Sequence, residues 1–351
     1  GHYTDLHERA EAIKRSITLE EERFYRTMER GLNELELMLD ELPEGGVISG
    51  EQAFYLKATL GLPIQVTKDI AEERGFGIDM QGFEAAEEEH SRVSGGGQAM
   101  GVIASAEFYA DLLQYLQEQG KLDASGVLYD PYVDEPSEGP VLALAQNGIR
   151  VESAIVGDKV EVVLPQTHFY VEAGGQVSDT GTISGDDWTI EVEGMRRPVA
   201  GLIVHIGEVV EGNPKVGDST SAEIDHERRR NITRNHTGTH LLHAALRKHL
   251  GTHVQQRGSL VAPDRLRFDF SHEEKVPADE LARIEAEVNE IILAEYPVRY
   301  EVKPLEQARA EGAMALFGEK YSEMVRTVII GDDEQRYSYQ LCGGVHVPDT
   351  T

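Results

Sequence analysis

Apolar residues recur at helical spacing along the first third of the chain. Residues 6–42 are rich in helix formers, and near their end Leu32, Leu35, Leu39 and Leu42 stand three or four positions apart, which places them on one side of a predicted helix that Pro43 ends. The same spacing predicts a second helical block at residues 51–74, broken near its middle by a glycine and a proline, and a further helix at 104–119. The glycine triplet 95–97 predicts a loop before that helix.

The pattern changes after about residue 120. Short runs rich in β-branched residues now alternate with glycine, aspartate and proline, as is typical of a small antiparallel barrel or sandwich. These runs fall at residues 160–164, 180–183, 188–192 and 202–206.

Beyond residue 226, helical and strand patterns alternate. The predicted elements are helices at 228–250, 278–295 and 305–310, a hairpin of 258–261 with 265–270, and strands at 298–302, 325–330 and 337–341. We therefore predict an α+β protein with three parts: a helical domain (1–122), a small glycine-rich β-barrel (123–225) and an α+β domain of helices on an antiparallel sheet (226–351).

Composition narrows the class of partner. With 63 acidic and 33 basic residues the net charge is −30, which argues against general binding to phosphate backbones. Any RNA contact must then depend on a local cluster such as the three arginines at 228–230. The single cysteine, Cys342, excludes an internal disulfide and fits a reducing cytosol. No apolar run approaches the roughly 18 residues of a membrane span, and the first ten residues are polar, so we expect a cytoplasmic protein without a membrane partner.

Two separate segments carry metal-ligand spacing. His236 and His240 stand four residues apart in a predicted helix, so both imidazoles project from one face. More than a hundred residues later, Cys342 and His346 flank a glycine pair that allows a tight turn. Three nitrogens and one thiolate form the ligand set of a tetrahedral zinc site, so the sequence predicts zinc as the cofactor.

A chance histidine pair and a metalloprotease motif are the alternatives to a zinc site of this kind. In a chain with 13 histidines one such pair can arise by chance: His249 and His253 have the same spacing, although Gly251 between them is expected to end the helix. The cysteine four residues from a histidine is what favours a metal site. A metalloprotease needs a glutamate directly after the first histidine of the pair, and Thr237 occupies that position.

These segments resemble the editing domain of alanyl-tRNA synthetases. The resemblance lies in residues 235–246, 251–260, 266–270 and 342–346, in the glycine-rich motif 169–176 with 179–181 that precedes the domain, and in 18–31 and 61–67, which are similar to the end of the tRNA-recognition helices. It spans nearly the whole chain. No segment resembles the class II aminoacylation core or the C-terminal extension, which leaves an excised fragment or a chain that has lost its ligase part.

The resemblance implies a hydrolase that edits tRNA(Ala) wrongly charged with serine, or with glycine, after transfer. It implies zinc ligation by His236, His240, Cys342 and His346. Its expected partners are tRNA(Ala) and the rest of the synthetase, namely the aminoacylation domain, which carries out the ATP-dependent ligation of alanine, and the C-terminal extension.

The resemblance also implies roles for polar residues near the metal motif. Thr239, Gln256 and Cys342 would be catalytic, and Thr239, Gln256 and Ser259 would bind the substrate. A simpler interpretation makes Thr239 a helix hydroxyl bonded to the backbone and Ser259 an ordinary strand residue. Four protein ligands also describe a closed structural site. The alternatives are therefore a non-catalytic, zinc-stabilised tRNA-binding module and a freestanding deacylase that edits in trans.

Overall fold

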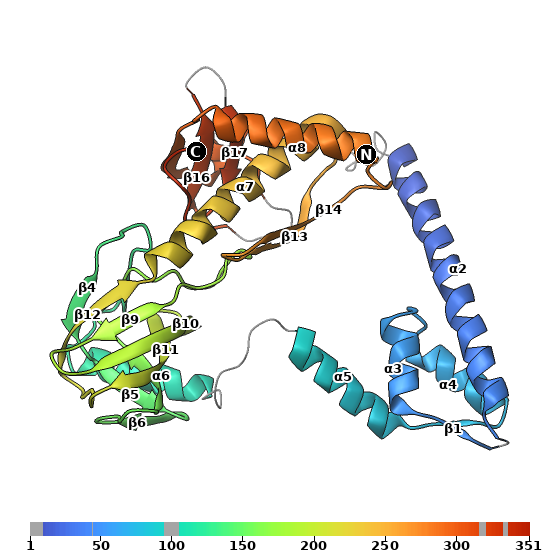
Figure 1. Ribbon diagram of the computed structural model, residues 1–351, viewed down its shortest axis with the longest axis horizontal. Helices are drawn as coiled ribbons and strands as arrows, with labels where there is room; N and C mark the ends of the chain where they lie inside the picture. The colour runs from blue at the N-terminus through green and yellow to red at the C-terminus, as the bar shows by residue number, and fades with distance from the viewer. Residues whose placement is uncertain (1–9, 44, 95–104, 316–320, 333–335) are drawn as a thin grey trace. The chain divides into compact units, whose positions relative to one another are not determined.

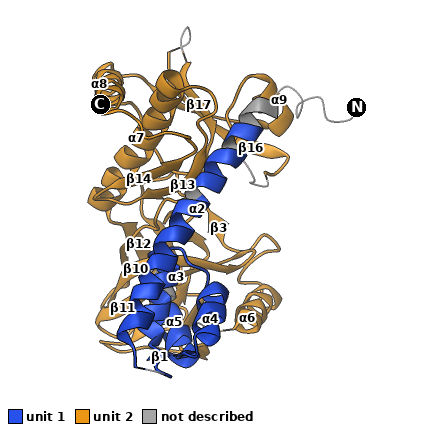
Figure 2. Cartoon of the chain, turned by 90° about the vertical axis from the view of Figure 1, so that its right-hand side faces the viewer, with its two compact units in different colours: residues 1–100 blue, residues 101–351 orange. Residues whose placement is uncertain are grey.

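The computed structural model describes residues 10–43, 45–94, 105–315, 321–332 and 336–351. The chain divides into two compact units, residues 1–100 and 101–351, which are coloured separately in Figure 2. No helix in the described part of the chain is long and apolar enough to cross a membrane.

The first unit is helical. It contains α2 (Ala10–Glu41), α3 (Gly50–Ala58), α4 (Ile64–Glu73) and α5 (Met80–Ser94), with a parallel pair of two-residue strands, β1 (Val47–Ile48) and β2 (Gly77–Ile78). The spaced leucines of α2 supply Leu35 and Leu39 to the core, where they pack with Leu56 and Leu62. The helix predicted at 6–42 is confirmed from residue 10 onward, and the one predicted at 51–74 is confirmed as two helices. Residues 6–9 and the predicted loop at 95–97 lie outside the described residues.

The second unit contains a curled antiparallel sheet of eight strands (Figure 1). In spatial order these are β4 (Ser137–Pro140), β12 (Ser219–Ile224), β9 (Gly181–Ser184), β10 (Thr189–Val199), β11 (Leu202–Glu211), β7 (Lys159–Val163), β5 (Ala143–Gln146) and β6 (Ile149–Val151). A short parallel pair, β3 (Leu128–Tyr129) with β8 (Gln166–Thr167), lies outside this sheet. The four strands predicted from β-branched runs all belong to the large sheet.

Helix α6 (Ala106–Glu118) belongs to the core of this sheet. Tyr109, Leu112 and Leu116 are buried there together with strand residues such as Val162, and the Tyr109 hydroxyl donates to Glu161 at 2.9 Å. The two compact units accordingly part near residue 100, whereas the sequence predicts its first boundary after residue 122. The amphipathic pattern of α6 shows that it buries one face but not which partner covers that face.

The remainder of the second unit has helices against antiparallel strands. Its elements are α7 (His226–Leu250), the hairpin of β13 (Gln256–Val261) and β14 (Leu266–Phe270), α8 (Ala278–Leu293), α9 (Leu305–Ala310), and a three-stranded sheet of β15 (Val298–Pro304), β16 (Met324–Gly331) and β17 (Arg336–Leu341). Asp225 caps the N-terminus of α7 by accepting from the Arg228 backbone N–H. The predicted α+β class is confirmed by this combination of helices and antiparallel sheets.

The first turn of α7 is anchored to the segments around the curled sheet by Arg229. Its side chain is 6% exposed and pairs with Asp179, and it also donates to the carbonyls of Pro131 and His168. Arg228 donates to the Ser178 carbonyl at 3.3 Å. The predicted phosphate-binding cluster at 228–230 is therefore wrong as a group of three, because burial commits Arg229 to the protein interior and leaves Arg230 as the exposed arginine.

Candidate functional site

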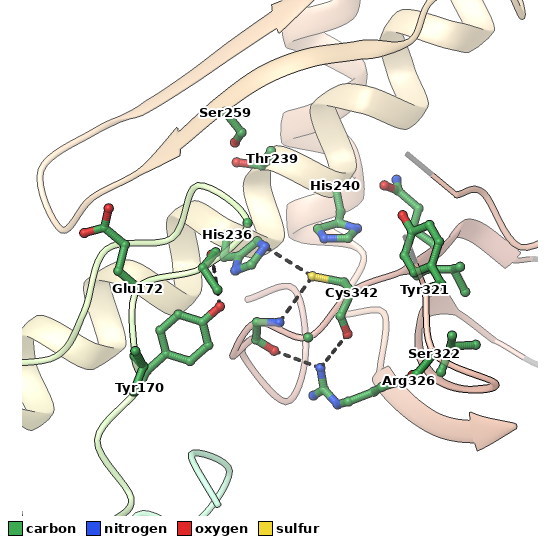
Figure 3. A pocket seen from close by; sticks show the side chains of 18 of the residues that line it. Tyr170, Glu172, His236, Thr239, His240, Ser259, Tyr321, Ser322, Arg326 and Cys342 are labelled. Atoms are coloured by element: carbon green, nitrogen blue, oxygen red, sulfur yellow. Dashed lines mark hydrogen bonds between the residues drawn. The ribbon is translucent and has the colours of Figure 1, made fainter. Parts of the chain in front are cut away.

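The four predicted metal ligands lie together in the structure. His236 and His240 project from successive turns of α7, and Cys342 and His346 come from the segment that follows β17 (Figure 3). One candidate ligand atom of each residue lies within 4.8 Å of the others. The sulfur of Cys342 stands 3.4 Å from His236 Nε2. Residues separated by about a hundred positions therefore form one cluster that could hold a metal ion.

A close approach at Gly344 permits this geometry. A Cβ atom on Gly344 would stand 2.0 Å from Cε1 of the His236 ring, far inside van der Waals contact. Glycine is thus the residue that lets the segment after β17 pass directly under the helix. The backbone N–H of Gly344 faces the Cys342 sulfur at 3.4 Å.

Arg326 on β16 holds the backbone of the same segment. It donates to the carbonyls of Cys342 at 3.0 Å and Gly344 at 2.8 Å, and its guanidinium lies 4.0 Å from the ring centres of both Tyr132 and Tyr300. Such stacking places the planar cation between two aromatic faces. The Tyr132 hydroxyl, from the segment between β3 and β4, donates to the Gly343 carbonyl at 2.8 Å.

Burial keeps the three histidines neutral. Loss of solvent lowers the pKa of His236 to about 3, with further lowering from Arg326. It also lowers the pKa values of His240 and His346 well below the ordinary 6.5, with further lowering from neighbouring histidines and Arg326. Neutral imidazole is the form that ligates a metal. His240 Nδ1 and His346 Nε2 are buried nitrogens without a hydrogen-bond partner. An ion would satisfy buried atoms of this kind, and the nitrogen and thiolate donors fit zinc.

A cavity of about 480 Å³ opens beside this cluster. Its walls include the three residues predicted to recognise the substrate, which are Thr239 on α7 and Gln256 and Ser259 on β13. The Thr239 hydroxyl donates to the Asn235 carbonyl one turn earlier at 2.8 Å, as the simpler interpretation of this residue expects. Its oxygen can still accept a hydrogen bond, so the backbone contact limits its role but does not remove it.

Further residues of the site are not predictable from spacing or residue type. Arg326 and Tyr170 line the cavity, and Thr237 bonds to His346 Nδ1 at 3.3 Å. Gln176 bonds to His236 Nδ1 at 2.6 Å. Gln176 and Tyr170 lie in the glycine-rich motif, and Thr237 lies in residues 235–246, which also resemble the family, although these motifs alone assign none of them a role at the metal.

The second histidine pair is separated in the structure. The His249 ring bonds to Glu280 and Glu287 of α8 at 2.8 Å each, and its pKa is raised by the hydrogen bonds to Glu287 and then Glu280. His253 bonds instead to His272 at 3.0 Å. Gly251 ends α7 between them, as the sequence predicts.

Comparison with known proteins identifies similar chains. A family model described as tRNA synthetases class II (A) matches residues 1–228, which is more than half of the chain and ends in the first turn of α7. The alanine–tRNA ligase of a Chelativorans strain is 43% identical over 99% of this chain. The alanine–tRNA ligases of Cereibacter sphaeroides and Thermus thermophilus are 43% and 44% identical over 98% and 99% of it.

In each case the match covers 39% of the relative's own length. The chain therefore spans well under half of the curated relatives that it matches. The four-residue cluster lies beyond the region of the family model but inside the region shared with the ligases.

Proposed function

The chain belongs to the class II (A) tRNA synthetase family, and from this premise we propose that it is the editing part of an alanine–tRNA ligase. Its reaction is the hydrolysis of the ester that joins serine to tRNA(Ala); the glycine ester, which lacks the serine hydroxyl, would be the weaker substrate. One observation carries the proposal: a cavity bordered on one side by the His/Cys cluster and on another by three side chains able to bind a hydroxyl.

The chemistry of the two amino acids explains why such a cavity is useful. Serine differs from alanine by one hydroxyl, and a pocket shaped for alanine rejects such an addition only about a hundredfold. A site that requires a hydroxyl can reject its absence by roughly 10⁴. Thr239, Gln256 and Ser259 supply the polar atoms for that requirement. Because the Thr239 proton is engaged by Asn235, Thr239 acts as the acceptor for the serine hydroxyl.

His236, His240, Cys342 and His346 would hold a zinc ion at the end of this cavity. When bound, zinc supplies Lewis acidity next to the ester. The protein's own residues position the ligands and the substrate. Arg326 holds the Cys342 segment by donating to the carbonyls of Cys342 and Gly344, and the hydroxyl-binding side chains orient the seryl group.

The partners follow from the same proposal. tRNA(Ala) is the substrate carrier, and the helical unit 1–100 contributes to its binding, since the family model covers it. The aminoacylation domain and the C-terminal extension of the full synthetase are the remaining partners. With a net charge of −30, binding depends on local contacts and is expected to weaken as salt rises.

One observation favours a second candidate. All four ligand atoms lie within 4.8 Å of one another, and a closed set of four protein ligands is typical of structural zinc. The alternative function is therefore a zinc-stabilised tRNA-binding module without turnover. It predicts tRNA binding and a zinc content of about one ion per chain, both lost in Cys342→Ala, but no release of serine.

The deciding experiment is single-turnover deacylation of Ser-tRNA(Ala), Gly-tRNA(Ala) and Ala-tRNA(Ala). We expect fast loss of serine and very slow loss of alanine. Thr239→Val should slow serine release and keep zinc, because it removes the acceptor and preserves the shape. Thr233→Val is the matched control: Thr233 is on the same helix, bonds a backbone carbonyl in the same way at 2.8 Å, and does not line the cavity.

Each outcome has a distinct meaning. If Thr239→Val keeps the full preference for serine, Thr239 is only a helix residue. If the wild-type chain binds zinc and tRNA but releases no serine, the binding-module alternative replaces the proposal.

A further inference from the structure

The side chain of Gln176 reaches the His/Cys cluster from the glycine-rich segment between β8 and β9. Gln176 is fully buried, at 0% exposure, and its Oε1 atom contacts both halves of the ligand set. It lies 2.6 Å from Nδ1 of His236 on α7, and it accepts from the backbone N–H of Val345 at 3.1 Å. Val345 lies directly before His346, so one amide oxygen contacts one proposed ligand directly and the backbone next to another.

These two contacts fix the protonation of the His236 ring. A backbone N–H can only donate, so the Gln176 atom that faces Val345 is the amide oxygen. That same oxygen cannot donate to His236, so Nδ1 of His236 carries the proton. The lone pair of the ring then resides on Nε2, the nitrogen that stands 3.4 Å from the Cys342 sulfur. His236 is thereby set to ligate through Nε2.

The glycine-rich turn places Gln176 at this point. Gly174 and Gly175 have φ values of +59° and +87°, which favour glycine, and Ala173 and Gln176 close the turn with backbone hydrogen bonds of 3.0 and 3.2 Å. The turn is fastened to the hairpin, since Val261 N–H donates to the Gly175 carbonyl at 2.7 Å. A Cβ on Gly175 would stand 2.5 Å from the Ser259 carbonyl oxygen, so the approach requires glycine.

We propose that Gln176 is the positioning residue of the metal centre. Its amide oxygen holds His236 in the Nδ1–H form and at the same time holds Val345, which sets the spacing between the helix ligands and the loop ligands. The role is distinct from substrate recognition and rests only on a metal occupying the proposed ligand set. Hydrogen bonds of this kind to ligating histidines orient the ring and raise its basicity, and their loss weakens metal binding by about 10–100-fold.

Zinc affinity measured by competition with a chromogenic chelator tests the proposal without reference to deacylation. Gln176→Leu keeps the bulk of the side chain and removes the acceptor, so we expect a loss of about 10–100-fold and an altered visible spectrum of the Co²⁺-substituted protein. Gln176→Glu keeps an acceptor for both donors and should bind zinc about as tightly as wild type.

The matched control is Gln340→Leu. Gln340 is also buried and its Oε1 atom contacts a histidine of α7, but that residue is His243, at 3.3 Å, which is outside the ligand set. Its replacement should leave zinc affinity within a small factor of wild type. Equal losses in Gln176→Leu and Gln340→Leu would mean general damage to packing and would overturn the proposal, as would wild-type affinity in Gln176→Leu or a large loss in Gln176→Glu.

A measurement on the unaltered chain decides the matter even if Gln176→Leu does not fold. Long-range ¹H–¹⁵N correlation spectra of the zinc-loaded wild-type protein should show His236 protonated at Nδ1. Protonation at Nε2 would contradict the proposed role. Normal zinc results with no serine release would refute the editing function alone, and serine release with an unaffected Gln176→Leu would refute this inference alone.

Discussion

Replacing Arg229 should destabilise the second unit more than any exposed arginine does. The guanidinium makes a forked contact with Asp179, with Nε at 3.0 and 2.9 Å from the two carboxylate oxygens, and donates at 2.8 Å to the carbonyls of Pro131 and His168. The Arg229 and Asp179 side chains are 6% and 1% exposed. Arg229→Met keeps the apolar stem and removes every one of these donors.

The loss of unfolding free energy follows from the buried groups that Arg229→Met leaves without a partner. In the variant, Asp179 keeps the Tyr170 N–H at 2.6 Å as a donor but loses its buried counter-charge, and two carbonyls lose their donors. Breaking a buried pair in this way costs about 3–5 kcal/mol. For a unit of this size each kcal/mol lowers the melting temperature by about 2–4 °C, so we expect a fall of about 6–20 °C.

Urea unfolding and thermal melting of wild type, Arg229→Met, Asp179→Leu and the double variant measure this effect. Because the two residues share one contact, the double variant should lose about 1–3 kcal/mol less than the sum of the single losses. Arg230→Met, next in the chain and exposed, should change stability by no more than about 0.5 kcal/mol. A loss under about 1 kcal/mol in Arg229→Met, or strict additivity, would refute the reasoning.

Two further predictions concern the metal segment and the end of α7. Gly344→Ala should abolish tight zinc binding, because its Cβ would stand 2.0 Å from the His236 ring. Gly343→Ala should keep zinc bound, because its Cβ would meet nothing within 4 Å. Equal zinc affinities of the two variants would contradict this geometry. The hydrogen bonds to Glu287 and Glu280 raise the pKa of His249, so its pairing with the α8 carboxylates is fully present below the unfolded-state pKa and is lost as pH rises through the folded-state value. The unfolding free energy of wild type should therefore fall relative to that of His249→Gln as pH rises above the ordinary histidine pKa of about 6.5, and parallel pH profiles would exclude this link.

The local pattern predicts the elements well because helix and strand periodicity is a local property. The helix that carries the metal pair and the hairpin after it agree with the sequence prediction to within a few residues, and the ligand cluster follows from spacing and residue type. The partner of α6 is not predictable, since its apolar face suits any core. The burial of Arg229 is also not predictable, because a run of three arginines is typical of an exposed surface. Its buried partner, Asp179, lies 50 residues earlier in the chain.

The same distinction explains why only part of the proposed metal centre is predictable from the sequence. A ligand pattern names the residues that could bind a metal, but their orientation comes from residues that precede and follow strands of the curled-sheet region: Tyr132 bonds the Gly343 carbonyl, and Gln176 bonds His236. Gln176 lies three residues before Asp179, whose backbone N–H and carboxylate both bond to Tyr170 at the start of the glycine-rich segment. Arg229 therefore holds one end of the segment 176–179, through Asp179, and the contact with His236 holds the other end, through Gln176. Damage to the anchor should loosen the orientation of His236 even though Arg229 touches no ligand, so Arg229→Met is expected to weaken zinc binding as well as stability.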